Sequence, residues 1–384
     1  MSGLVVTADD FGLAPEVNKA VEQAHRHGIL SAASLMVAGP AAAQAVMLAR
    51  ATPSLRVGLH LVLVEGIPAS PPEEIPDLID REGMLRTDMV RLARDIALRP
   101  RARRQLRREI TAQFELFRRT GLPLDHVNAH KHFHVHPLIA TDVLKIGREY
   151  GMKALRVPYE PAAVVSRAES AAIEAWTHSR HPEVRASAAS EADVLRGPRV
   201  AAGFAQATPV TAPPPQDDDQ SSCPPVLQPR ERPDPPHLNP LPKGERERTE
   251  FAAAASTHSH SAQKIMSPWN ALLRTRARRA GLTTPDAVFG LRFTGALTAG
   301  RLRGILNHLP DGLIEIYTHP ASTNSFAGHV PGYRYAEELQ ALTDPEVIEA
   351  LRRSGRRLRG YADTFATPLD AADSLSLRTS GSRL

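Results

Sequence analysis

The chain has 384 residues, of which 42% are hydrophobic and 23% are charged, and its formal net charge is +5. This length is enough for one large core or for two domains. A single cysteine excludes a disulfide framework and any metal site built from several thiolates, and it indicates a reducing compartment. No apolar run reaches the roughly 18 residues of a membrane span, and two carboxylates among the first ten residues argue against a signal peptide. We therefore expect a soluble, cytoplasmic protein.

Short apolar runs alternate with helical patterns along most of the chain. Strands are expected at residues 4–7, 32–37, 56–63, 125–136, 154–157 and 313–317, and helices at 17–27, 89–98, 105–119 and 138–150. This alternation predicts an α/β fold with a parallel sheet, either open or closed into a barrel. Ligands of such folds bind at the carboxyl ends of the strands. Every candidate catalytic residue named below lies in a predicted strand or at the end of one.

One region differs in composition from the rest of the chain. Residues 209–242 contain twelve prolines, and the surrounding stretch shows little sustained periodicity. Such a sequence buries too little apolar surface to offset the entropy lost on ordering. We predict a single domain formed by residues 1–165 and 263–366. A disordered insertion at 166–262 would interrupt it, and a flexible tail at 367–384 would follow it.

Basic residues are concentrated in two stretches. Residues 86–119 hold eleven arginines against four acids, and Arg274, Arg276, Arg278 and Arg279 form a second cluster. Such stretches can bind nucleic acid or anionic lipid, but solvated helix faces are the more common explanation. Neither stretch has interleaved aromatic residues of the kind that stack on bases, so no nucleic-acid partner is expected.

The first predicted strand ends in Asp9-Asp10-Phe11-Gly12. Because side chains alternate along a strand, two adjacent carboxylates are expected to point in opposite directions. One could bind a metal ion while the other serves as a base close to it. The motif is also compatible with an ordinary turn, in which Asp and Gly are common.

Histidines provide the strongest signal. Five of the sixteen lie within residues 126–136, all at even positions, and Asn128 is among them. In an extended chain this period of two places every imidazole on one face, which favours a metal site over a surface polyhistidine stretch. His60 lies alone in an apolar strand, where a histidine is more often a satisfied core residue than a ligand.

Two further candidates lie in short apolar strands. His319 follows a strand and, beside a metal site, would be a candidate general acid. Arg156 could orient or tune a carboxylate through a charge-assisted hydrogen bond, although a strand-end arginine is common in any fold.

These motifs together resemble a known family. In chain order, Asp9-Asp10-Phe11-Gly12 with Asn18, Gly58-Leu59-His60-Leu61, the His130/His132/His134 run and Tyr317-Thr318-His319-Pro320 resemble the YdjC-like (ChbG-type) carbohydrate deacetylases. The resemblance covers about residues 3–164 and 266–365. It implies a distorted TIM-like β/α barrel, a divalent metal ion (Mg or Zn), and hydrolysis of an N-acetyl group on a sugar.

The resemblance also implies roles for individual residues. Asp10, His60 and His130 would hold the metal, with Asp9 as the base and His319 as the acid. His132 and His134 lie in the family's histidine run and are candidates for an additional part of the site.

Two segments are similar to the hopanoid biosynthesis-associated (HpnK-type) branch of this family, namely residues 156–160 and 289–291. This similarity implies an N-acetylglucosaminyl hopanoid lipid as substrate and peripheral contact with an anionic membrane. The two basic stretches, with Trp269, Leu272 and Leu273 beside the second, are suitable for such contact. The oligomeric state stays open, a homodimer included.

Two other classes of function are compatible with the same residues. A metal-dependent phosphohydrolase or sugar isomerase on the same barrel would need phosphate-binding glycines near the last strands, for which Gly290 and Gly295 are available. A non-catalytic metal- or lipid-binding protein would keep its ligands but could lose Asp9 and His319 without consequence.

Overall fold

A sheet of parallel strands forms the centre of this computed structural model, which describes residues 3–167, 169–170 and 260–365. Six strands lie within these ranges: β1 (Gly3–Phe11), β2 (Ala32–Leu35), β3 (Arg56–Leu61), β4 (Val127–Ala129), β5 (Ala287–Phe289) and β6 (Leu313–Thr318). Their order is β4-β3-β2-β1-β6-β5, and every neighbouring pair is parallel. Strands β1, β2 and β6 are buried throughout, which explains why they read as apolar runs.

The two edges of the sheet are joined by an irregular segment. The backbone N–H of Arg156 donates to Val127 in β4 at 2.9 Å, and the N–H of Leu155 donates to Thr283 at 3.0 Å. Farther along, the N–H of Val288 in β5 donates to Tyr159 at 2.8 Å. The strand expected at residues 154–157 is therefore present only as isolated bridges, and these close the sheet. The expected α/β fold with a distorted TIM-like barrel is confirmed.

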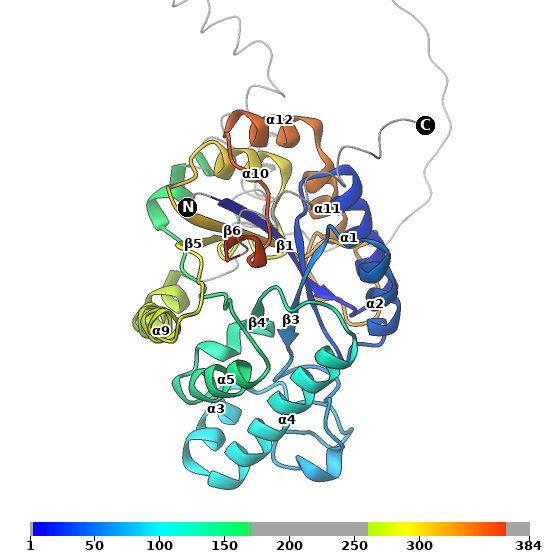
Figure 1. The fold of residues 1–384 in the computed structure, drawn as a ribbon, viewed down its shortest axis with the longest axis vertical. Helices are drawn as coiled ribbons and strands as arrows, with labels where there is room; N and C mark the ends of the chain where they lie inside the picture. Colours follow the sequence, from blue (N-terminus) through cyan, green and yellow to red (C-terminus); the bar gives the residue numbers. More distant parts are fainter. Residues whose placement is uncertain (1–2, 168, 171–259, 366–384) are drawn as a thin grey trace, which may run out of the picture. The chain divides into compact units, whose positions relative to one another are not determined.

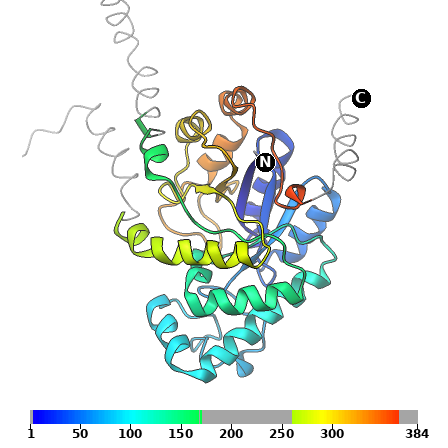
Figure 2. The same ribbon diagram turned by 60° about the vertical axis from the view of Figure 1, so that its left-hand side comes forward.

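Helices surround the sheet (Figures 1 and 2). They are α1 (Pro15–His27), α2 (Ala42–Ala51), α3 (Met89–Leu98), α4 (Pro100–Arg119), α5 (Pro137–Glu149), α9 (His260–Arg279), α10 (Ala299–Leu306), α11 (Tyr335–Thr343) and α12 (Pro345–Arg353). Short 3-10 helices are η1 (Pro72–Glu74), η2 (His130–Val135) and η3 (Ala362–Thr364). The four helices expected from the sequence are confirmed. α4 begins five residues earlier than expected, because Pro100 fits the first turn of a helix, where no amide donor is needed.

The histidine run does not form the long strand expected from its alternation. Only Val127–Ala129 is extended, and a 3-10 helix follows, with Lys131 and His132 at φ values of 52° and 54°. These left-handed residues turn the chain, so the imidazoles point to different partners rather than to one face. The expectation of a single imidazole face is wrong, because a period of two in the sequence does not reveal where the backbone leaves the β conformation.

Strands on both sides of the proline-rich region belong to the same sheet, since β1 pairs with β6 along six residues. The expected insertion lies outside the described residues except at its margins, and so does almost all of the expected C-terminal tail. Both remain predictions. No helix of the described ranges is long and apolar enough to cross a membrane.

Candidate metal centre and active site

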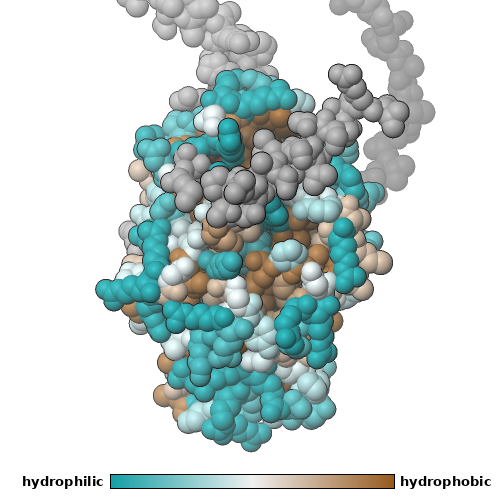
Figure 3. Space-filling model, in the orientation of Figure 1, coloured by the Kyte–Doolittle hydropathy of each residue, from teal (hydrophilic) through white to brown (hydrophobic). Residues whose placement is uncertain are grey.

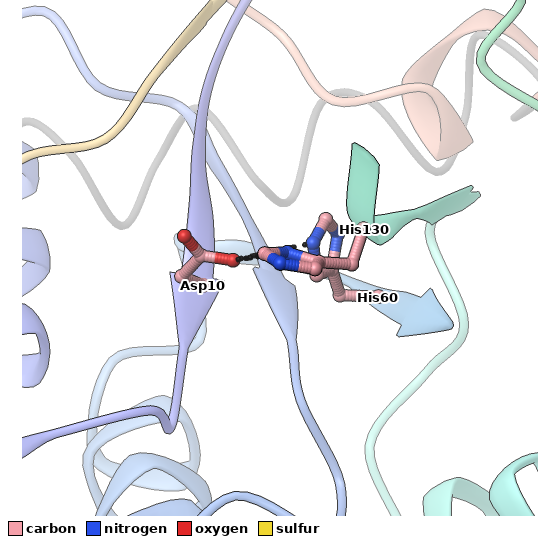
Figure 4. Close-up of side chains that lie close together, drawn as sticks. All are labelled: Asp10, His60 and His130. Carbon is pink, nitrogen blue, oxygen red and sulfur yellow. Dashed lines mark hydrogen bonds and ion pairs between the residues drawn. The ribbon is translucent and has the colours of Figure 1, made fainter. Parts of the chain in front are cut away.

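Three predicted ligands meet at the carboxyl ends of β1, β3 and β4 (Figure 4). Nε2 of His60 lies 3.3 Å, and Nδ1 of His130 lies 3.2 Å, from Oδ1 of Asp10. One ligand atom from each of the three lies within 4.8 Å of the others. Asp10 and His60 are buried, while His130 is partly exposed and opens the cluster to one side. We call these three residues the metal cluster.

The end of β1 is shaped by an irregular backbone. Asp10 has a φ of 62°, and the register of β1 against β2 shifts between Ala8 and Phe11. Such an irregularity breaks the two-residue alternation of a strand. As a result both carboxylates reach the pair formed by His60 and Asn128: Asp9 accepts from Asn128, and Asp10 lies beside His60. The expectation that they point in opposite directions is therefore wrong.

The next turn holds this backbone in place. Gly12 has a φ of 93°, which favours glycine, and its N–H donates to Oδ1 of Asn18 at 2.9 Å. Nδ2 of Asn18 donates in turn to the carbonyl of Ala41 at 3.1 Å. Asn18 therefore positions the ligand-bearing loop and does not reach the metal cluster through any recorded hydrogen bond among the described residues.

Asn128 connects the metal cluster to Asp9. Its Oδ1 lies 2.7 Å from Nδ1 of His60, and its Nδ2 donates to Asp9 at 3.0 Å and to Ser34 at 2.9 Å. Because the amide oxygen only accepts, Nδ1 of His60 carries the proton, and Nε2 is left with its lone pair toward the cluster. Orientation of a metal-binding imidazole by such a partner is common in metal sites.

The residues of the cluster fit a divalent cation. Nε2 of His60 is buried and has no hydrogen-bond partner within the described ranges. The carboxylate of Asp10 lies beside it, and a carboxylate and an unprotonated nitrogen can both bind a cation. Burial by itself would raise the pKa of Asp10, but the hydrogen bond and charge of His130 hold it well below its usual value, so the carboxylate is ionised. One carboxylate and two imidazoles form a donor set suited to Zn²⁺ and related ions.

A buried arginine lies behind the metal cluster. Arg156 binds Asp9 through both terminal nitrogens, at 2.5 and 2.9 Å, and binds Glu315 at 2.6 and 3.0 Å. Glu315 also accepts from the hydroxyls of Thr7 and Tyr361, at 2.8 and 2.6 Å. Arg156 and Glu315 have no exposed surface. We call Asp9, Arg156, Glu315 and Tyr361 the arginine cluster.

This cluster fixes the charge of Asp9. Burial alone would raise the pKa of Asp9, but the charge of Arg156, aided by His60 and by direct hydrogen bonds, lowers it far below the usual value. Asp9 is therefore ionised at any physiological pH. Its Oδ2 accepts only one recorded hydrogen bond from the described residues, so a lone pair is left for a proton.

His319 follows β6 and lies between two tyrosine rings. Its ring centroid is 5.4 Å from that of Tyr317 and 5.4 Å from that of Tyr333. Its backbone N–H donates to the buried carboxylate of Glu338 at 2.5 Å. Burial lowers the pKa of His319, and the charges of Asp10 and Asp9 act in the opposite direction. Both carboxylates are thus close enough to His319 to influence its protonation.

The two additional histidine candidates differ in their surroundings. Nε2 of His134 lies 2.8 Å from the carbonyl oxygen of Arg156, and burial lowers the pKa of His134 to about 4, so this neutral imidazole braces the arginine segment. His132 packs its ring against Tyr317, and its buried Nδ1 has no partner among the described residues. Nδ1 of His134 is likewise buried without a partner among the described residues, so each of the two imidazoles keeps one ring nitrogen that could reach a ligand.

Several residues of the site were not identified from the sequence. They are Ser34, Glu315, Glu338 and Tyr361, together with the roles of Asn128 and Tyr317. Glu315 carried a usable signal, since a carboxylate inside an apolar strand must find a buried partner. Tyr361 carried none, because its contact with Glu315 spans 46 residues and depends on how the segment after α12 folds back.

Comparison with known proteins agrees with this architecture. The family model described as "YdjC-like protein" matches residues 3–353, which is most of the chain. The chain belongs to the YdjC-like family. The matched range contains the metal cluster, Asp9, Arg156 and His319.

Curated relatives carry the name carbohydrate deacetylase. The protein of Brevibacillus brevis is 40% identical over 147 residues, which are 38% of this chain and 56% of that protein. Those of Oceanobacillus iheyensis and Vibrio cholerae are 32% and 34% identical over 38% of this chain, and the matches cover 60% and 56% of their lengths. The chain thus aligns with little more than half the length of these relatives.

A solved structure from Enterococcus faecalis, described as a candidate for cellobiose-phosphate cleavage, is similar in fold. Its TM-score is 0.55 at 17% identity, with 94% of this chain and 98% of that chain covered. This similarity supports the fold and is too distant to assign an activity.

Proposed function

We propose that the protein is a metal-dependent carbohydrate deacetylase that hydrolyses the N-acetyl group of an N-acetylglucosamine unit. The observation that carries the proposal is the metal cluster directly beside an ionised Asp9, with His319 on the neighbouring strand. The names of the curated relatives are in accord with it.

The protein's own residues supply the proton transfers. Asp9 takes a proton from the water that adds to the acetyl carbonyl carbon. As the C–N bond breaks, His319 in its protonated form gives a proton to the amine, so that acetate and a free amino sugar leave. Arg156 and Asn128 hold Asp9 in place for this step through three hydrogen bonds. Exchange with solvent then removes the proton from Asp9 and returns one to His319.

A divalent ion, when bound, lowers the pKa of water and polarises the carbonyl group. Asp10, His60 and His130 would hold it. Two imidazole donors favour Zn²⁺ over Mg²⁺, which prefers oxygen ligands. Metal content after equilibration with equal concentrations of both ions tests this preference.

The phosphohydrolase alternative lacks its expected feature. Among the two candidate glycines, the N–H of Gly290 donates to the carboxylate of Glu160 at 2.9 Å, as do those of Leu291 and Arg292 at 3.1 and 3.0 Å. Gly295 lies against the ring of Tyr333. A protein carboxylate thus occupies the backbone donors that a phosphate would need.

For the substrate we propose an N-acetylglucosaminyl lipid of the hopanoid type, approached from an anionic membrane surface at the cytoplasmic side. On α9, Trp269 and Leu272 are 42% and 43% exposed, which suits interfacial contact, although Leu273 is buried. Arg276 and Arg278 are engaged with Thr141 and Asp286.

The first basic stretch lies mainly on α3 and α4, whose surface is largely hydrophilic (Figure 3). Many of its arginines pair with acids, for example Arg103 and Arg107 with Asp142. These pairs favour a solvated helix face there. The second cluster, on α9, has the exposed Trp269 and Leu272 beside it, and it is the surface that we propose for membrane contact.

Acetate release from a soluble N-acetylglucosaminide by the zinc-loaded protein tests the proposed activity, with Asp9→Asn and His319→Ala as variants. Both variants should retain the metal and lose most of the turnover. Full activity in both would support a non-catalytic metal-binding protein.

Membrane contact is tested separately. Replacing the four α9 arginines by Ser should weaken binding to anionic vesicles and leave the activity on the soluble substrate unchanged. An equal loss of vesicle binding and of activity on the soluble substrate would refute membrane contact.

A further inference from the structure

The ring of Tyr317 lies at the centre of the candidate active site. Its centroid is 5.4 Å from that of His132 and 5.4 Å from that of His319, with interplanar angles of 80° and 79°. The guanidinium carbon of Arg156 lies 5.0 Å from the same centroid. Tyr317 is 3% exposed. One ring thus contacts the proposed acid, a neighbouring histidine and the arginine that holds the proposed base.

The two imidazoles share the contact with this ring, and His319 also packs against Tyr333. Neither His132 nor His319 makes a side-chain hydrogen bond to any described residue, and Nδ1 of each is buried without a partner. The nearly perpendicular contacts are the favourable edge-to-face arrangement of aromatic rings. An imidazole that must transfer a proton needs a fixed orientation, and no recorded hydrogen bond supplies it here.

Tyr317 is itself held by a hydrogen-bonded loop. Its hydroxyl lies 2.6 Å from Oγ1 of Thr294, which is also within bonding distance of the carbonyls of Gly290 and Leu291, at 3.1 and 2.9 Å. Carbonyl oxygens only accept, so the threonine gives its proton to one of them and Tyr317 donates to Thr294. The tyrosine proton is therefore committed to the loop and is not available for transfer to substrate.

The loop is built on Glu160. The carboxylate of Glu160 accepts from three consecutive N–H groups, those of residues 290–292. Gly290 has a φ of 107°, and a Cβ atom there would lie 2.5 Å from the carbonyl oxygen of Tyr317. The segments 156–160 and 289–291 both stood out in the sequence, and of their residues only Arg156 has a place in the proposed reaction. The two segments meet beside Tyr317.

We propose that Tyr317 is a positioning residue that fixes the imidazoles of His319 and His132, and that the loop of residues 290–294, held by Glu160, fixes Tyr317. The effect of Tyr317 on catalysis rests on the proposed deacetylase function, whereas its effect on the orientation of the two imidazoles does not.

Four variants test the proposal. Tyr317→Leu removes the ring, Tyr317→Phe keeps the ring without the hydroxyl, and Thr294→Val removes the hydroxyl that anchors Tyr317. Thr294→Ser is the matched control, since it keeps the hydroxyl.

The geometric consequence is measured by NMR of protein labelled on its histidine rings. His319 also packs against the ring of Tyr333, and His308, which follows α10, has no ring contact with Tyr317 among the described residues. In Tyr317→Leu the C–H resonances of His308 should not move, whereas the ring-current shifts that Tyr317 causes at His132 and His319 should disappear. They should persist in Tyr317→Phe and Thr294→Ser. If the two resonances move no more than that of His308, the proposal is wrong, whatever the protein catalyses.

The catalytic consequence is measured with two substrates. Cleavage of an N-acetylglucosaminide needs a proton on the leaving amine, whereas p-nitrophenyl acetate releases a phenolate that needs none. Tyr317→Leu should lower kcat/KM for the amide by about 10²-fold or more, the order of a general acid's contribution. The ester should change less than about threefold, and the metal content should stay at the native level.

The outcomes separate the two proposals. An equal loss on the amide and the ester would overturn the positioning role and indicate a structural one. Thr294→Val should show a smaller selective loss than Tyr317→Leu and Thr294→Ser none, so the test remains decisive if Tyr317→Leu does not fold. If the native zinc protein cleaves no amide while the ring-current shifts behave as expected, the proposed function fails and the positioning geometry stands.

Discussion

The metal cluster and the arginine cluster lie side by side and both are largely buried, with only His130 partly exposed, yet their polar atoms are satisfied differently. In the arginine cluster the guanidinium of Arg156 is bonded to two carboxylates, and the outer oxygen of Glu315 is bonded to Tyr361. In the metal cluster Nε2 of His60 has no hydrogen-bond partner among the described residues. Since burial of an unpaired polar atom is costly, the first group is a complete scaffold and the second is complete only with a ligand.

The largest effect is expected from breaking the metal cluster. His60→Ala should abolish stoichiometric zinc binding and reduce acetate release by about 10³-fold or more, because the ion contributes several kcal/mol to the reaction. Metal analysis and an acetate assay measure this.

His126 provides the matched control, because both of its ring nitrogens are bonded, to Asp125 and to Ser34. His126→Ala should lose folding stability but still bind zinc one to one. A zinc-binding His60→Ala protein would refute the assignment of this cluster.

Breaking the arginine cluster should mainly affect stability. Arg156→Met leaves two buried carboxylates without their cation, and we expect a loss of about 3–5 kcal/mol in the free energy of unfolding. Urea denaturation of the metal-free protein measures it. Arg103→Met, which removes a partly exposed partner of Asp142, should cost less than about 1 kcal/mol. Equal losses in the two variants would contradict the distinction between the clusters.

Glu338 is an intermediate case, a buried carboxylate that accepts only backbone N–H groups in the recorded hydrogen bonds, from His319 and Leu297. Burial raises its pKa to about 7, against the effect of those bonds. Between pH 4.5 and about 7, Glu338 is therefore protonated in the folded state and ionised in the unfolded state. Stability should be highest below pH 4.5 and fall by up to about 3 kcal/mol as the pH rises through 7.

Unfolding at pH 5 and pH 8 tests this expectation. Glu338→Gln should remove most of the difference between the two pH values. Glu337→Gln, on the same helix but partly exposed, should leave it unchanged. A pH dependence that survives in Glu338→Gln would show that another group is responsible.

A smaller effect is expected where the two clusters join. Asn128→Ala removes the partner that orients His60 and one of the donors to Asp9. Loss of such an outer contact weakens metal binding by about 10–100-fold. Competition with a chelator of known affinity measures the change, and an unaltered zinc affinity would show that the orientation of His60 is fixed by other contacts.

The smallest effect is expected from shortening the chain. Replacing residues 171–259 by a Gly/Ser linker of about 15 residues should change stability by no more than about 1 kcal/mol and leave zinc binding intact. The described residues already contain both clusters and a closed sheet. Loss of folding or of zinc would show that the proline-rich region contributes to the domain.

The sequence by itself determined the fold class and most of the candidate site. Its alternating apolar runs placed four strands and four helices, because buried parallel strands and amphipathic helices leave periodic patterns. The resemblance to the YdjC-like family selected Asp10, His60 and His130. Their positions in or at the ends of expected parallel strands predicted that they meet, since the carboxyl ends of such strands share one edge of the sheet.

Only the tertiary structure decided how the residues are held there. The left-handed turns at Asp10, Lys131 and His132 depend on packing that a two-residue period does not encode. The contacts of Arg156 with Glu315, and of Glu315 with Tyr361, join segments up to 159 residues apart. A buried charge must be paired, but the sequence does not name its partner, because that choice is made by the way the barrel closes.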